Sequence, residues 1–273
     1  MIQKYTEYVT SMIYSRLPFS PIRTRTRSYL ASPQTLPPCG TTITPPTQHI
    51  STNPPAFLNM PSQLAQTDAI PCTANQAHLA IKQAIALNAF GTLYTTSSKP
   101  SSYTSAGHVA ASALSNPSFA TIASTPSHFT LHYPNPDSKP WITACHLFPD
   151  ILLNLNAFPT STYASQSAFY PTVRDVAGVP VQSPVPDPAN PWARTDIMLW
   201  AAATATNNKT RDMFTNDVHA YLVGNGSRTV PFGDRFYTGG AKAGMEWGWR
   251  ARPVVGGHFA VMASEMGPNS ILV

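Results

Sequence analysis

The sequence predicts an α+β protein with a helix-rich core, short carboxyl-terminal strands and a long extended proline-rich amino-terminal arm. Three observations lead to this prediction. Proline accounts for 28 of the 273 residues and forms three pairs before residue 60, apolar residues then recur with helical spacing, and glycine punctuates short apolar runs near the end. The hydrophobic content of 42% is enough for a sizeable core. We expect residues 1–72 to form a helix and a basic arm, and residues 73–273 to form a single core domain.

The arm is expected to begin with an amphipathic helix over residues 1–16, because its apolar side chains share one helical face. Beyond it, proline pairs remove backbone donors and forbid a helix, so the chain to about residue 72 should be extended. The apolar residues of the face are Ile2, Tyr5, Val9, Met12 and Ile13, and the pairs are Pro37-Pro38, Pro45-Pro46 and Pro54-Pro55.

Local signals then predict the first half of the core. A helix is expected from about residue 73, ended by Gly91, and a second, rich in small residues, over 105–115. The stretch HFTLHYP at 128–134 is typical of a strand. The apolar segment 142–158 is either a strand followed by a helix or two helices, broken at Pro149.

The second half begins with a proline-rich loop near residues 171–190. Asn190 and Pro191 suit the start of a helix through WARTDIMLWAAATAT, and a second helix, KTRDMFTNDVHAYLV, should follow Asn207-Asn208. Its expected buried stripe is Met213, Phe214, Val218 and Leu222. The stretches RTVPF, DRFYT, MEWGWRAR and HFAVMAS are interpreted as short strands.

Charge is scarce and unevenly placed. Charged residues make up 11% of the chain, well below the roughly 25% of an ordinary soluble domain. Before Asp68 there are five basic residues and one acidic one, giving +4 of the total net charge of +5. A basic terminal arm is typical of contact with nucleic acid or an anionic membrane. A surface of small neutral groups favours self-association.

Two sets of residues are candidates for RNA binding. Alternate arginines in SPIRTRTRSY would share one side of an extended chain and could contact phosphates; a subunit-contact arm is the alternative. Tryptophans in MEWGWRAR could stack on bases beside cationic groups, or could simply belong to the core. The candidates are Arg16, Arg23, Arg25 and Arg27 in the first set, and Trp247, Trp249, Arg250 and Arg252 in the second.

Enzyme signatures are weak. On a strand, His128 and His132 would lie ~13 Å apart, too far to share a metal ion. Cys145 and His146 would point to opposite faces of a strand, so a buried structural cysteine is favoured over a nucleophile. The stretch GGAKAG lacks the ending of a phosphate-binding Walker loop. We therefore expect no catalytic role, no metal and no cofactor.

By composition, the chain resembles the proline-alanine-serine-rich RNA-associated protein of the polymycoviruses, which are double-stranded RNA viruses of fungi. More distantly, PDPANPWAR and TRDMFTNDV are similar to the stretch near the RNA groove of flexuous filamentous virus coat proteins. The resemblance implies a protein that coats viral RNA, self-associates and lacks catalysis.

We accordingly expect a viral structural protein that binds genomic RNA without sequence preference and lies in a virion or a cytoplasmic ribonucleoprotein. Viral RNA and further copies of the chain are the expected partners, and no membrane is expected. The alternative is an organelle-targeted or host-interacting protein, because the first ~30 residues resemble an address or a membrane-binding helix.

Overall fold

The computed structural model describes residues 75–96, 102–117, 119–134, 140–224, 231, 233–248 and 250–266. All of these residues belong to one compact unit, residues 51–273. Helices dominate this part of the chain and its strands are two or three residues long, so the predicted helix-rich character with short strands is confirmed. The helix and the arm predicted for residues 1–72 lie outside the described residues.

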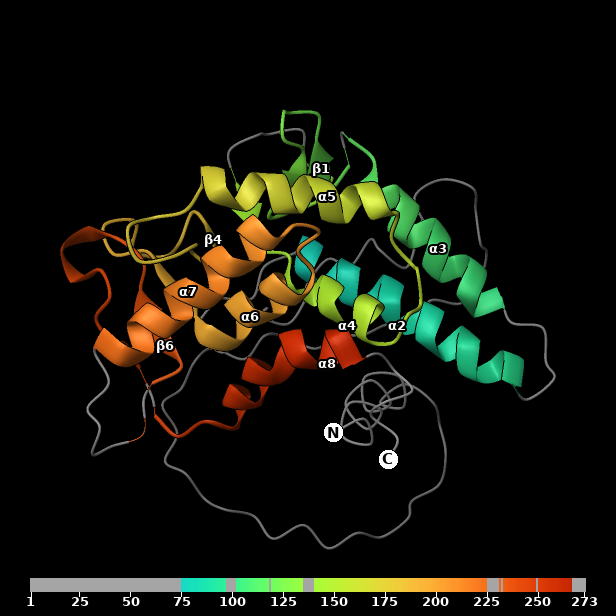
Figure 1. The fold of residues 1–273 in the computed structure, drawn as a ribbon. Coiled ribbons are helices and arrows are strands. Elements are labelled where there is room, and N and C mark those ends of the chain that lie inside the picture. The colour runs from blue at the N-terminus through green and yellow to red at the C-terminus, as the bar shows by residue number, and fades with distance from the viewer. Residues whose placement is uncertain are drawn as a thin grey trace, which may run out of the picture. The chain divides into compact units, whose positions relative to one another are not determined.

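The described elements follow one another as shown in Figure 1. The α-helices are α2 (Ala77–Thr96), α3 (Ser102–Ser115), α4 (Phe148–Leu152), α5 (Thr160–Phe169), α6 (Thr195–Ala203), α7 (Asn208–Gly224) and α8 (Ala260–Met266). The 3₁₀-helices are η2 (Cys145–Leu147), η3 (Tyr170–Thr172), η4 (Gly240–Lys242) and η5 (Pro253–Phe259). The strands pair antiparallel: β1 (Thr121–Ile122) with β2 (His128–Phe129), β3 (Trp141–Ile142) with β4 (Gln182–Ser183), and β5 (Trp192–Arg194) with β6 (Arg235–Tyr237).

Consecutive helices pack side by side, α2 with α3 and α6 with α7 (Figure 1). Glycines allow the first pair to approach closely. A Cβ on Gly91 of α2 would overlap Thr104 of α3, and a Cβ on Gly107 of α3 would lie 2.8 Å from the carbonyl oxygen of Ala84. At both positions the absence of a side chain permits the contact.

Apolar side chains form three clusters inside the described residues. The first involves α2, α3 and the segment around β2, the second gathers around α6 and α7, and the third joins β5 to α6. Members of the clusters are Ile81, Leu114 and Phe129 in the first, Met198, Phe214 and Phe236 in the second, and Val181, Trp192 and Ile197 in the third.

Two predicted helix boundaries are wrong, both because of contacts distant in sequence. α2 continues through Gly91 to Thr96, since this glycine packs against α3 and does not end the helix. α6 begins at Thr195 and not near Pro191, because Trp192–Arg194 pair with β6.

Other elements differ in type or were not predicted. The stretch HFAVMAS, expected to be a strand, forms the end of η5 and most of α8. Residues 160–169, for which the sequence gives no clear signal, form α5. The helix predicted after Asn207 is confirmed as α7, and the Asn207 side chain accepts a hydrogen bond from the Thr210 N–H at 2.8 Å.

None of the helices in the described part of the chain combines the length and the apolar character needed to cross a bilayer.

Candidate functional site

Buried charge gathers at the start of α6, which lies beside α7 and α8 (Figure 1). The β5–β6 pair fixes this position by placing Arg194 opposite Arg235 and next to Asp234. Arg194 donates two hydrogen bonds to the Asp196 carboxylate, from Nε at 3.0 Å and from Nη2 at 2.7 Å. Arg194 is 7% exposed and Asp196 2%. Burial raises the pKa of the Asp196 carboxyl, and the Arg194 charge opposes that rise.

Asp234 is the most informative member of this cluster. Its carboxylate is buried and lies 3.4 Å from Nε of Arg194 and 3.6 Å from Nη1 of Arg252. Among the described residues, however, neither of its oxygens has a hydrogen-bond partner. Buried polar groups are almost always hydrogen-bonded, so a buried carboxylate that lacks a donor indicates a place for a ligand, a water or a proton.

A histidine–threonine pair lies in the same cluster. Nε2 of His258, on η5, lies 2.7 Å from Oγ1 of Thr195, the first residue of α6. Burial lowers the pKa of His258, and the negative charges of Asp196 and Asp234 oppose this effect. The imidazole is therefore neutral near pH 7 and can accept a proton. The η5 backbone packs tightly here, because a Cβ on Gly257 would lie 2.7 Å from Cβ of Asp196.

A second buried polar group consists of His78 on α2 with Cys145 and His146 on η2. The Nδ1 atoms of the two histidines are 2.5 Å apart, and Sγ of Cys145 lies 3.6 Å from Nδ1 of His146. The sequence-based interpretation of Cys145 and His146 as opposite faces of a strand is wrong, because a 3₁₀-turn brings the two side chains together. Burial raises the pKa of the Cys145 thiol to about 12 and lowers the pKa of both imidazoles.

This second group also lies against α6. The His146 ring contacts the Trp200 ring, with centroids 6.5 Å apart. Asp196 and Arg194 both act on the charge of Cys145, in opposite directions. The start of α6 therefore has two polar groups as neighbours. One is the charged cluster of Arg194, Asp196, Asp234, Arg252 and His258, and the other is the group of His78, Cys145 and His146.

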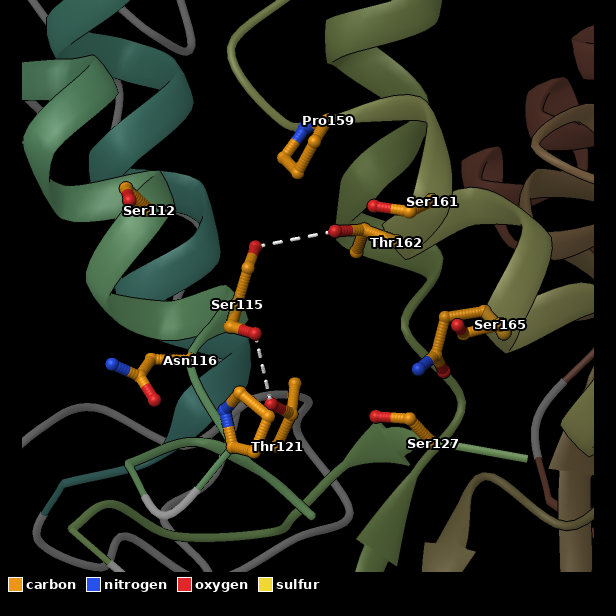
Figure 2. Close-up of a pocket in the computed structure, with 11 residues that line it drawn as sticks. Ser112, Ser115, Asn116, Thr121, Ser127, Pro159, Ser161, Thr162 and Ser165 are labelled. Carbon is orange, nitrogen blue, oxygen red and sulfur yellow. Dashed lines mark hydrogen bonds between the residues drawn. The ribbon is translucent and has the colours of Figure 1, made fainter. Parts of the chain in front are cut away.

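A cavity of about 550 Å³ lies between the end of α3 and the start of α5 (Figure 2). Hydrogen bonds join its walls: one links the hydroxyls of Ser115 and Thr162 at 3.2 Å, and in the other the Thr121 hydroxyl donates to the Ser115 carbonyl at 3.1 Å. No lining residue carries a charge, so the cavity is poorly suited to a charged amino acid. The lining consists of Ser112, Ser115, Asn116, Pro117, Thr121, Ser127, Pro159, Ser161, Thr162, Ser165 and Gln166.

Three of the residues expected to bind RNA, Trp247, Arg250 and Arg252, lie among the described residues, and each has contacts within the chain. Trp247 packs against Trp192 and stacks on Tyr237, with centroids 5.0 Å and 5.7 Å away. Arg250 pairs with Glu246, and Arg252 approaches Asp234. The remaining candidates, Arg16, Arg23, Arg25, Arg27 and Trp249, lie outside the described residues.

The residues of the charged cluster were not recognised from the sequence. The sequence patterns place Arg194 and Asp196 in an ordinary helix, and Asp234 and His258 in strands. The available signal was local: the stretch WARTDIMLW places two opposite charges in an otherwise apolar segment. Such charges are rarely buried unless they are paired.

Two pairs of helices that are consecutive in the sequence pack side by side, α2 with α3 and α6 with α7, which is the arrangement of helical hairpins. The chain belongs to the family of the Glutaminase A six helical-hairpin domain, which matches residues 56–262. It is 30% identical over 205 residues to Glutaminase A of Aspergillus oryzae (strain ATCC 42149 / RIB 40). That alignment covers 74% of this chain and 28% of the relative, so the chain spans little more than a quarter of the relative's length. No solved structure shows a significant match.

Family membership overturns the viral interpretation. The resemblance to polymycovirus proteins and to filamentous virus coat proteins, the function as an RNA-coating structural protein and the location in a virion are all wrong, because the chain matches a glutaminase A domain along most of its length. The first resemblance rests on composition and the second on two short stretches, and unrelated proteins can share both kinds of feature. Contact with nucleic acid and self-association are not tested by the match and stay predictions.

Proposed function

We propose that the charged cluster at the start of α6 is part of the active site of an enzyme that hydrolyses the side-chain amide of glutamine. The name of the Aspergillus relative and the family match support the substrate. The observation that carries the proposal is Asp234, a buried carboxylate that has no hydrogen-bond donor among the described residues. It lies close enough to His258 for its charge to oppose the lowering of the His258 pKa.

Amide hydrolysis needs a base that activates water and groups that stabilise the charge developing on the carbonyl oxygen. In the proposed mechanism, His258 donates Nε2–H to Thr195 and accepts a proton from water at Nδ1. Water adds to the amide carbon, the carbon–nitrogen bond breaks, and the proton leaves with ammonia. Asp196 and Asp234 stabilise the imidazolium, and the partly exposed Arg252 stabilises the oxyanion.

The test is ammonia release from L-glutamine by the purified full chain. Asp234→Asn keeps the shape of the side chain and removes its charge, so we expect ammonia release to fall by roughly 10²-fold or more. His258→Gln should have a similar effect. Asp212→Asn, on an exposed position of α7, is the matched control and should leave the rate unchanged.

Two outcomes would contradict the proposal. One is a wild-type chain that releases no more ammonia than buffer does. The other is an Asp234→Asn variant that is folded and as active as the control. Either outcome would favour the sequence-based expectation of no catalytic role, which is at present an untested prediction.

A further inference from the structure

Three side chains with the chemistry of metal ligands meet in the interior, and none of them belongs to the proposed catalytic groups. His78 lies at the start of α2, while Cys145 and His146 open η2, and all three are buried. The donor atoms of the three residues all lie within 4.8 Å of one another. We propose that His78, Cys145 and His146 form a binding site for Zn²⁺ or a similar divalent transition metal.

One of the two printed spacings is close to that of a tetrahedral site, and the other is shorter. With metal–sulfur and metal–nitrogen distances of about 2.3 and 2.0 Å, a sulfur and a nitrogen ligand lie about 3.5 Å apart. Sγ of Cys145 and Nδ1 of His146 are 3.6 Å apart, which agrees with that value. Two nitrogen ligands would lie about 3.3 Å apart, so the Nδ1 contact of 2.5 Å between His78 and His146 has to open when a metal enters.

One ring nitrogen of the histidine pair is available to bind a metal when the short Nδ1 contact opens. Nε2 of His78 is buried and has no hydrogen-bond partner among the described residues. In the metal-free arrangement, one imidazole donates a proton to the other across the short Nδ1 contact. A metal ion replaces that shared proton, and rotation of the His78 ring can present either nitrogen to it.

The charges around the three ligands indicate which proton a metal ion must displace when it binds. Lys82 and Arg194 are cations that act on this group, and Asp196 is an anion. The imidazoles are already neutral, whereas the thiol is protonated, so metal binding has to displace the thiol proton: M²⁺ and Cys–SH give M²⁺–S–Cys and H⁺. The thiolate supplies a negative charge that balances part of the cation. Cys and His together favour zinc, cobalt or copper over magnesium or calcium.

The test uses Co²⁺ as a spectroscopic substitute for Zn²⁺. Cys39→Ser and Cys72→Ser first make Cys145 the sole thiol of the full chain. Titration with Co²⁺ should produce a thiolate-to-cobalt charge-transfer band that saturates at one equivalent and disappears on addition of Zn²⁺. About one proton should be released for each metal bound.

Variants identify the ligands. Cys145→Ser should abolish the charge-transfer band, and His78→Gln or His146→Gln should weaken Co²⁺ binding by at least about tenfold. His219→Gln, at an exposed position of α7, is the matched control and should bind as the parent does. Circular dichroism shows whether each variant is folded.

The protein with only Cys39→Ser and Cys72→Ser tests the proposal even if a ligand variant does not fold. No charge-transfer band at excess Co²⁺ would overturn it, and so would a band that persists in folded Cys145→Ser. The readout does not depend on ammonia release, so the metal site and the proposed hydrolysis can fail separately.

Discussion

Asp150 is a buried carboxylate satisfied entirely by local donors. It accepts hydrogen bonds from the N–H groups of Ala157 at 2.9 Å and Phe158 at 3.0 Å, and from the hydroxyl of Tyr163 at 2.5 Å. Burial raises the pKa of Tyr163, and the Asp150 charge raises it further, so the hydroxyl stays protonated as a donor. These bonds tie α4, which holds Asp150, to the segment that follows it and to α5, the helix that the sequence did not predict.

Tyr163→Phe is expected to lower the free energy of unfolding by about 1.5–3 kcal/mol, because a buried carboxylate loses one of its donors. Urea unfolding followed by circular dichroism measures the change. In a double-mutant cycle with Asp150→Ala, which removes the acceptor, the two costs should not add, since both substitutions remove the same bond. Strictly additive costs would show that the two side chains do not interact.

The burial of His128 can be tested through the pH dependence of the free energy of unfolding. Its ring stacks on Phe169 with centroids 3.8 Å apart, and Nδ1 lies 3.3 Å from the Pro126 carbonyl. Burial lowers the pKa of His128, and the contact with Pro126 only partly opposes this. The unfolded chain therefore binds more protons than the folded one below about pH 6.5, so this residue's contribution to stability is complete above that pH and is lost on acidification.

We expect His128→Phe, which keeps an aromatic ring against Phe169, to lose less stability than the wild type when the pH falls from about 7.5 to about 5. The measurement is the free energy of unfolding at both pH values, and the comparison between the two proteins cancels the effects of other groups. An equal or steeper fall in the variant would mean that the folded environment does not disfavour the charged imidazole.

At the scale of elements, sequence signals succeeded where structure is set locally. α7 begins where Asn207 caps it, and Phe214 and Val218 are buried as predicted. Sequence signals gave the wrong helix boundary where a residue distant in sequence determines the local structure. Gly91 resembles a helix stop but is a contact with α3, and Trp192–Arg194 resemble a first helical turn but pair with a strand about 40 residues later. Tertiary contacts override local propensity at such positions.

Gly91→Ala tests this interpretation of α2. Alanine has a higher helix propensity than glycine by about 1 kcal/mol, so a glycine without a packing role would be stabilised by the change. Because the new methyl group would overlap Thr104, we expect a net loss of about 1–3 kcal/mol in the free energy of unfolding.

Gly224→Ala is the matched control, because Gly224 also lies in a helix and a Cβ there would meet nothing within 4 Å. It should be neutral or slightly stabilising in the same urea titration. If Gly91→Ala behaves like Gly224→Ala, α2 and α3 are not packed as closely as described.

The candidate sites belong to the scale of the whole molecule, which explains why sequence reasoning missed them. Arg194, Asp234 and His258 are spread over 65 positions of the chain. His78 is 68 residues from His146, although their rings are in contact. No local motif links such residues, and only the folded chain brings them together. Cys145 and His146 are adjacent in sequence, yet their usable geometry depended on a 3₁₀-turn that the sequence did not specify.

The boundary between residues 50 and 51 predicts which part of the chain is needed for a stable fold. Residues 51–273 form one compact unit, and the family match begins at residue 56. A chain beginning at Ser51 should therefore unfold cooperatively at the same temperature as the full chain. It should also keep the Co²⁺ signal, since His78, Cys145 and His146 are all retained. Thermal unfolding followed by circular dichroism compares the two.

A chain ending at Arg250 is the opposite control. It lacks η5 and α8, which pack on α6, and loses His258 from the charged cluster, so it should lose cooperative unfolding. A lowered midpoint in the chain that begins at Ser51 would show that residues 1–50 contribute to the fold. An unchanged midpoint would show that residues 1–50, which hold five basic residues and one acidic one, do not contribute to the stability of the fold. Any binding of nucleic acid through Arg16, Arg23, Arg25 and Arg27 could then be measured as a property of that segment, with the helical domain intact in both proteins.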